Sequence, residues 1–443
     1  VAYFLIMHES RLQMSSSQKP KVRSQNAETP EKNLWSTTLR SEARHPRRLI
    51  VKRLTLFKKA SMPSPAARRG FARGSPLFPT SLSRLCSGTA FAEARLMPAA
   101  LRIGTRTLSE QNPPLIIPEI GINHEGDMAK AMRMIDDAAC AGAECVKFQC
   151  HIPAEEMSAA ARKVVPGNAS ESIWEIISRC TLDEAQERDL KQYAESRGLL
   201  YLSTPFSRAA ADRLEAMGVL AYKIGSGECN NYPLVDHIAS FGKPILLSTG
   251  MNDLESIGKA VAICERRGVP YALLHCTSLY PTPYSKVRLG ALALMRQRFP
   301  KAVLGLSDHS LGPYTGFAAV ALGASIVEKH FTSDPNWPGP DIAISLTPEE
   351  LRQLVVGARA IFEASGGTKE ILPEEQPTID FAYACVVTLR EVKAGEALDA
   401  SRIWVKRPGN GEIRAERFPE VLGRRARVDL PADTQLCWEH LDA

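Results

Sequence analysis

The sequence predicts an α/β fold, a (β/α)8 TIM barrel followed by a small β-rich domain. From residue 115 onward, short apolar runs alternate with amphipathic helical stretches. The eight units occupy about 250 residues, which is the usual size of a TIM barrel. Nearly every apolar run ends in polar residues, as buried parallel strands do where they open into an active site. A doubly wound sheet is the alternative, but it does not explain the polar strand ends.

The eight predicted strands are short runs rich in aliphatic residues. They are Leu115–Asn123, Cys145–Gln149, Leu199–Phe206, Ala221–Glu228, Pro244–Gly250, Tyr271–Pro281, Val303–Ser310 and Ser325–Thr332. The clearest helical patterns between and after them are Lys130–Ala143, Asp183–Arg197, Leu254–Arg267, Leu311–Leu322 and Pro348–Ala364. Because parallel strands of a barrel point the same way, their polar C-terminal ends should meet at one mouth.

The chain divides into four segments. Residues 97–368 form the predicted barrel. Residues 369–382, which include Pro373 and Pro377, are predicted to be a linker, and residues 383–443 are predicted to form a small domain. That domain contains three short β runs separated by turns: Ala384–Leu389, Ile403–Lys406 and Arg427–Leu430. Its core is marginal by itself, so we expect it to pack against a partner.

The first segment, residues 1–96, lacks sustained periodicity and is rich in Ser, Arg and Pro. An organelle transit peptide has this composition. The other interpretation is upstream sequence translated from a start placed too early, since Met97 directly precedes the first ordered-looking stretch. We favour the second interpretation and expect a disordered segment outside the fold.

Composition excludes several classes of protein. Residues 1–96 hold 18 Lys and Arg against 5 Asp and Glu, whereas the rest holds 37 against 44, so the body is mildly acidic despite a net charge of +6. A general nucleic-acid surface is therefore not expected. No apolar run is long enough to span a membrane. The ten cysteines include no C-x-x-C pair, which indicates reduced thiols in a cytoplasmic protein.

Two consecutive predicted strands each carry one histidine near the C-terminal end, His309 and His330. One histidine at a strand end is usually a core or capping residue. Two at neighbouring strand ends can share a divalent metal through their imidazole nitrogens, so the pair predicts a metal site.

Two lysines, Lys147 and Lys223, are predicted to point into the barrel, where they would repel each other unless an anion lies between them. Pairing with Glu119 and Glu228 is the structural alternative, and it is compatible with an anion site. Hydroxyl groups at other strand ends suit phosphate and carboxylate oxygens; they belong to Thr204, Ser248 and Ser307. Glu119 is suited to proton transfer or charge stabilisation, and Asp341 to substrate hydroxyls. This inventory suits the joining of a phosphorylated acid to a sugar.

Long motifs in residues 113–443 resemble the sialic acid synthase family. They include Glu-Ile-Gly-Ile-Asn-His-Glu-Gly, Val-Lys-Phe-Gln, Tyr-Lys-Ile-Gly-Ser-Gly-Glu, Ser-Asp-His-Ser, Lys-His-Phe-Thr and Lys-Arg-Pro-Gly-Asn-Gly. The resemblance implies a TIM barrel with a C-terminal antifreeze-like (SAF, β-clip) domain, in a domain-swapped homodimer whose small domain covers the partner's barrel mouth. It implies an N-acetylneuraminate synthase, a transferase that condenses phosphoenolpyruvate with N-acetylmannosamine and water.

The resemblance also implies roles for individual residues. His309 and His330 would bind a divalent metal, usually Mn²⁺, with Mg²⁺ and Co²⁺ as alternatives, and Glu119 would lie beside the reacting carbons. Phosphoenolpyruvate would be held by Lys147, Thr204, Lys223, Ser226, Ser248 and Ser307. The sugar would be contacted by Asn168, Tyr280, Asp341 and, from the partner subunit, Arg407. The family often has Asn where this chain has Ser278, whose side chain reaches less far.

Three other functions are weighed against this one. A legionaminate or pseudaminate synthase shares the chemistry and differs in the sugar contacts. A Schiff-base sialic acid aldolase would need a lysine of depressed pKa and no metal, which the histidine pair argues against. A non-catalytic carbohydrate-binding protein would not need the lysines, histidines and carboxylates together.

Overall fold

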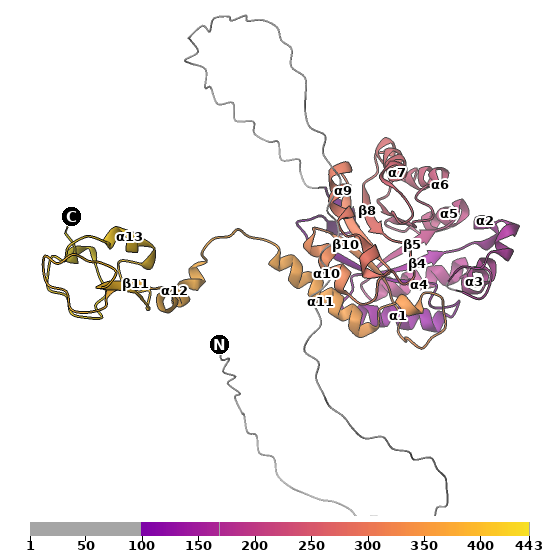
Figure 1. Cartoon of the computed structure of the whole chain (residues 1–443). Helices are drawn as coiled ribbons and strands as arrows, with labels where there is room; N and C mark the ends of the chain where they lie inside the picture. Colours follow the sequence, from indigo (N-terminus) through magenta and orange to yellow (C-terminus); the bar gives the residue numbers. More distant parts are fainter. Residues whose placement is uncertain (1–98, 168, 443) are drawn as a thin grey trace, which may run out of the picture. The chain divides into compact units, whose positions relative to one another are not determined.

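A computed structural model describes residues 99–442 except residue 168; the predicted leader, residues 1–96, lies outside the described residues. Eight parallel strands form the predicted barrel, which is thereby confirmed (Figure 1). They are β3 (Leu115–Gly121), β4 (Cys145–Cys150), β5 (Leu200–Pro205), β6 (Tyr222–Ile224), β7 (Ile245–Ser248), β8 (Tyr271–Cys276), β9 (Val303–Asp308) and β10 (Ile326–His330). The sheet order is β5-β4-β3-β10-β9-β8-β7-β6, so the first and last barrel strands are paired.

Helices surround the strands (Figure 1). The α-helices of this part are α1 (Met128–Cys140), α2 (Pro153–Glu156), α3 (Ile173–Cys180), α4 (Glu184–Ser196), α5 (Arg208–Ala216), α6 (Tyr232–Ala239), α7 (Leu254–Arg267), α8 (Tyr284–Val287), α9 (Ala291–Arg298), α10 (Tyr314–Ala321) and α11 (Pro348–Ala364). Two 3₁₀ helices, Ala159–Lys163 and Ile342–Ile344, lie in the connections. Among the described residues, no helix combines the length and the apolar character that a bilayer crossing requires.

Local sequence signals explain where the long helices begin and end. Asp183 and Thr347 accept hydrogen bonds from the third backbone N–H of α4 and α11, forming capping boxes with Gln186 and Glu350. Gly268 ends α7 in the left-handed conformation that glycine adopts at low cost. The predicted helix Leu311–Leu322 is shorter than expected, because α10 begins only after Pro313.

An antiparallel hairpin that the sequence analysis did not predict precedes the barrel. It consists of β1 (Leu101–Ile103) and β2 (Arg106–Leu108). Its buried apolar side chains pack with the interior side chains near the N-terminal ends of the barrel strands, such as Leu115 and Ile326. Apolar side chains therefore fill the N-terminal half of the barrel, and the polar interior residues lie toward the C-terminal ends of the strands, the barrel mouth.

The C-terminal part of the chain has a small core of its own. Strands β11 (Cys385–Thr388) and β12 (Ile403–Lys406) pair antiparallel. The third predicted β run, Arg427–Leu430, is not a strand; it makes an isolated bridge from Leu430 to Val392. The helices here are α12 (Gln376–Ala382), α13 (Phe418–Val421) and the 3₁₀ turns Pro373–Glu375, Ala415–Arg417 and Trp438–His440. The 3₁₀ turn Pro373–Glu375 and α12 lie within the segment that we interpret as a linker.

Candidate active site

A buried ion pair occupies the centre of the barrel mouth. Glu119 on β3 and Lys147 on β4 are register partners, and Lys147 Nζ lies 2.6 Å from Glu119 Oε2. Lys147 also donates to Thr204 Oγ1 at 3.0 Å, and Gln149 Nε2 donates to Glu119 Oε1 at 2.8 Å. Because Glu119 and Lys147 are 2% and 3% exposed, their charges face each other and not solvent. The structure thus brings together three of the predicted site residues.

A second buried cluster surrounds Lys223 on β6. Lys223 Nζ donates to Ser248 Oγ at 2.7 Å and lies 3.7 Å from Glu328 Oε1 on β10. Ser307 Oγ on β9 donates to the same Glu328 oxygen at 3.1 Å. The alternative that paired Lys223 with Glu228 was wrong about the carboxylate: among the described residues the ion pair of Lys223 is with Glu328.

The interior charges alter one another's pKa values. Burial raises the pKa of Glu119, and Lys147 opposes this. Burial alone would lower the pKa of Lys147, but the carboxylates of Glu119 and Glu328 raise it above its ordinary value. Burial lowers the pKa of Lys223, and repulsion from Lys147 adds to this. Burial opposes ionisation of Glu328, but the two lysines lower its pKa on balance. Lys147 is therefore a cation at neutral pH, suited to an anionic ligand.

The two predicted metal ligands lie side by side at the mouth. His309 follows β9, His330 ends β10, and their ring centroids are 5.5 Å apart. His309 Nδ1 donates to Thr277 O at 3.0 Å, which leaves its Nε2 as the basic nitrogen. His330 Nδ1 is buried without a hydrogen-bond partner and lies 3.8 Å from Asp341 Oδ2.

These two imidazoles fit a divalent metal when both are neutral. Burial would lower the pKa of His309, but its contact with Cys276 raises that pKa, so His309 must release a proton to bind a metal. Burial lowers the pKa of His330 well below its usual value, so its ring is neutral, as a metal ligand must be. No group of three His, Cys, Asp or Glu side chains placed to hold a metal occurs among the described residues. A metal held here by two imidazoles would keep open coordination positions for a substrate.

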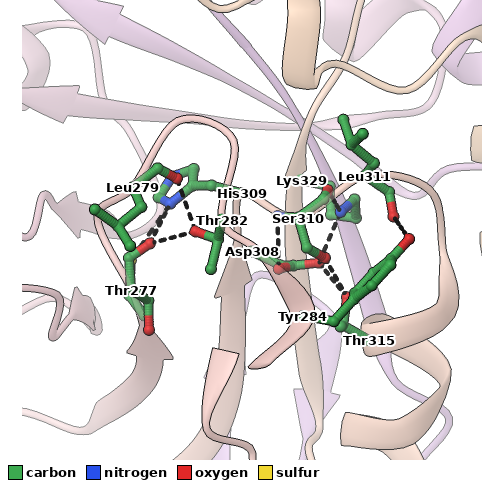
Figure 2. A network of polar contacts seen from close by, with 11 residues as sticks. Thr277, Leu279, Thr282, Tyr284, Asp308, His309, Ser310, Leu311, Thr315 and Lys329 are labelled. Carbon is green, nitrogen blue, oxygen red and sulfur yellow. Dashed lines mark hydrogen bonds and ion pairs between the residues drawn. The ribbon is translucent and has the colours of Figure 1, made fainter. Parts of the chain in front are cut away.

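A polar network lies beside the histidine pair, and Figure 2 shows this network together with His309. Successive residues of a strand point to opposite faces, so Asp308 and Lys329 point away from the side that carries His309 and His330. Lys329 Nζ lies 2.7 Å from Asp308 Oδ2 and donates to Ser310 O at 2.7 Å, and Thr315 donates to the same carboxylate. This network joins the ends of β9 and β10 directly beside the two histidines.

Breaking this pair is expected to destabilise the barrel. The side chains of Asp308 and Lys329 are each 1% exposed, so Lys329→Met leaves a buried carboxylate without its cation. We expect a loss of about 3–5 kcal/mol in the free energy of unfolding. The double variant Asp308→Asn/Lys329→Met removes both charges and should lose less. Urea unfolding measures both; a double variant that is no more stable than the single one contradicts the prediction.

Residues on the loops complete the mouth. The Tyr280 ring lies 4.2 Å from that of His309. Ser226 Oγ accepts the Gly250 N–H at 2.9 Å, and Ser278 Oγ is buried without a partner. A Cβ at Gly250 would lie 2.3 Å from Ser278 Oγ, so only glycine fits here. Burial raises the pKa of Asp341 to about 6.

Two predicted sugar contacts are not placed at the mouth. Asn168 lies outside the described residues, although its neighbours line a cavity of about 640 Å³ that is also bounded by residues 338–340, next to Asp341. Arg407 follows β12 in the C-terminal domain and is exposed there.

The sequence analysis missed Glu328, Gln149 and His151 as site residues. Glu328 carried a usable signal, because it lies two residues before His330 and strand alternation points both side chains into the barrel. Gln149 likewise lies two residues after Lys147 on β4. His151 follows the end of that strand, and no pattern in the sequence indicates its partners.

Glu228 allows a pH-dependent prediction. Burial raises its pKa from 4.5 to about 7. Between these values the folded state keeps the proton while the unfolded state releases it, so stability falls as the pH rises through this window. We expect Glu228→Gln to remove this loss, about 1–3 kcal/mol, and to raise Tm relative to wild type at pH 8 but not at pH 4.5. Calorimetry at both pH values tests this; equal Tm differences at the two would contradict it.

Comparison with known proteins links this geometry to one group. Residues 134–370 match the NeuB family, and residues 383–442 match the SAF domain. The N,N'-diacetyllegionaminic acid synthase of Campylobacter jejuni subsp. jejuni serotype O:2 is 38% identical over 327 residues, which cover 72% of this chain and 97% of that protein. The N-acetylneuraminate-9-phosphate synthase of Homo sapiens is 31% identical over 344 residues, 76% of this chain and 95% of that protein.

A solved structure resembles the fold as well. The crystal structure of N-acetylneuraminic acid synthetase from Leptospira borgpetersenii serovar Hardjo-bovis, in complex with citrate, aligns with a TM-score of 0.59 at 31% identity. The alignment covers 64% of this chain and 96% of that one.

Proposed function

The chain belongs to the NeuB family of sialic acid synthases, and from this we propose that it is an N-acetylneuraminate synthase. It would condense phosphoenolpyruvate with N-acetylmannosamine and water to give N-acetylneuraminate and phosphate. The observation that carries the proposal is the barrel mouth, where two buried lysines with hydroxyl partners lie among the strands that present the two histidines.

The lysines and hydroxyls would bind phosphoenolpyruvate. Lys147 with Thr204, and Lys223 with Ser248, offer charge-assisted donors to the phosphate and carboxylate oxygens. The hydroxyl groups of Ser226 and Ser307 would donate further hydrogen bonds to the same oxygens. An incoming anion would compete with Glu119 and Glu328 for the lysines.

A divalent metal, Mn²⁺ in the first place, would be held by His309 and His330 and would supply Lewis-acid polarisation of the sugar aldehyde. Tyr280 and Asp341, which lie beside the two histidines, would orient the sugar. The cavity beside Asp341 would take the end of the sugar remote from the aldehyde.

Glu119 would serve the reacting carbons. C3 of phosphoenolpyruvate forms the new bond to the aldehyde carbon, and the aldehyde oxygen gains a proton. Water adds to C2 and loses a proton. The new C2 hydroxyl then loses its proton as the C2–O bond to phosphate breaks, which leaves the C2 ketone and inorganic phosphate. The Glu119 carboxylate would stabilise positive charge at C2 and orient that water.

Phosphate release by the purified protein tests the proposal. Release from phosphoenolpyruvate and N-acetylmannosamine that is lost with EDTA and restored by Mn²⁺ supports it. Release only with a 6-deoxy diacetamido sugar would instead make the chain a legionaminate or pseudaminate synthase; the Campylobacter relative reported above favours the first of these. Absence of release with either sugar would overturn the proposal.

We also propose a domain-swapped homodimer in which Arg407 completes the partner's site. Arg407→Ala and His309→Ala should each be inactive alone. When the two variants are co-expressed, about half of the dimers should contain one subunit of each kind. Each mixed dimer has one intact mouth out of two, so about a quarter of all sites should be active. A co-expressed mixture as inactive as the single variants contradicts the swap.

A further inference from the structure

A buried chain of hydrogen bonds runs outward from Glu119 to a second carboxylate. Gln149 Nε2 donates to Glu119 Oε1 at 2.8 Å, and Gln149 Oε1 lies 2.9 Å from His151 Nε2. His151 Nδ1 lies 3.0 Å from each carboxylate oxygen of Glu156, the last residue of α2. The side chains of His151 and Glu156 are only 4% and 6% exposed.

The proton positions along this chain follow from its chemistry. The Glu119 oxygen accepts, so the amide nitrogen of Gln149 faces it and the amide oxygen faces His151. That oxygen can only accept, which requires a proton on His151 Nε2. With that proton on Nε2, His151 Nδ1 can pair with Glu156 only through one further proton, carried by the ring nitrogen or by the carboxyl group. The histidine therefore prevents the Gln149 amide from turning its oxygen toward Glu119.

Neighbouring residues fix both ends of this series of hydrogen bonds. The His151 ring stacks on Phe206, with centroids 4.4 Å apart. Gly121 adopts a φ of +56°, and a Cβ there would lie 3.1 Å from Glu119 Oε1 and 3.2 Å from Gln149 Nε2. The glycine thus leaves space for the contact between the amide and the carboxylate.

We propose that His151 and Glu156 are positioning residues, which act through Gln149 to fix the orientation of the Glu119 carboxylate. The proposal rests on the proposed function, in which Glu119 serves the reacting carbons. Neither His151 nor Glu156 has to touch substrate. The competing explanation is that the pair only anchors α2 to the barrel.

A double-mutant cycle separates the two explanations. His151→Phe keeps a ring against Phe206 but cannot donate to Gln149, and we expect kcat to fall about 10- to 100-fold, with KM for both substrates changed less than about threefold. In a Gln149→Leu background the same substitution should cost less than about twofold, because its route to Glu119 is already lost. His151→Gln, whose amide can donate, should recover part of kcat. Additive losses, or an unchanged kcat in His151→Phe, overturn the proposal.

A readout without turnover keeps this test separate from the proposed function. In protein labelled with ¹⁵N-histidine, the ring signals of His151, identified by their loss in His151→Phe, should show a protonated Nε2. Gln149→Leu should shift that signal. An unprotonated Nε2, or a signal that Gln149→Leu leaves unmoved, overturns the proposal even if no tested sugar is turned over. Wild-type phosphate release, measured first, judges the proposed function alone.

Discussion

Alanine at His309 or at His330 is expected to lower kcat about a thousandfold, equivalent to about 4 kcal/mol in the activation barrier. Each substitution leaves a single imidazole for the metal, so Mn²⁺ measured by mass spectrometry after gel filtration should fall well below one ion per chain. The rings lie 5.5 Å apart at the barrel mouth, and His330 Nδ1 has no hydrogen-bond partner to lose. His309→Ala loses one hydrogen bond, from Nδ1 to Thr277 O. Because so few contacts are lost, both variants should remain folded.

His237 provides the matched control for these variants. It lies on α6, away from the mouth, and pairs with Asp212 at 2.7 Å. His237→Ala should keep both metal and turnover. Metal content and kcat that stay at wild-type values in His309→Ala and His330→Ala would remove the metal site from the proposed function.

Glu119→Gln is expected to lower kcat about 100- to 1000-fold while phosphoenolpyruvate still binds. The amide is nearly isosteric, but it carries no negative charge to stabilise C2 or to orient the water. Calorimetric titration with phosphoenolpyruvate should give an affinity equal to or tighter than that of wild type, because Lys147 no longer has a competing anion.

A second buried carboxylate serves as the control for Glu119→Gln. Glu187 is 2% exposed, lies on α4 and contacts Cys150 and Arg213 outside the mouth. Glu187→Gln should leave kcat within about twofold of wild type. An equal loss of kcat in both variants would show a general effect of buried carboxylates and not a role of Glu119.

The sequence predicted the barrel because its signals are local: apolar runs of strand length, helix caps such as Asp183, and turns between them. Family membership followed from long motifs and is confirmed. The hairpin β1–β2 was not predicted, because strands of only three residues show almost no periodicity in the sequence. The partner that the structural alternative gave to Lys223 was wrong because Glu228 and Glu328 both lie near strand ends. Only the folded barrel brings Glu328 on β10 to 3.7 Å from Lys223 on β6.

The residues around the predicted site were harder to foresee. His151 and Glu156 lie beyond the end of β4, where strand alternation no longer determines the direction of a side chain. The pairing of Asp308 with Lys329 depends on the register of two neighbouring strands, β9 and β10, which no single stretch of sequence specifies.

The hairpin β1–β2 covers the N-terminal end of the barrel. Its apolar side chains pack against the interior side chains of the strands there, so the barrel interior is filled by apolar groups at this end. In the proposed reaction, both substrates would therefore enter and both products would leave at the barrel mouth, on the C-terminal side of the strands.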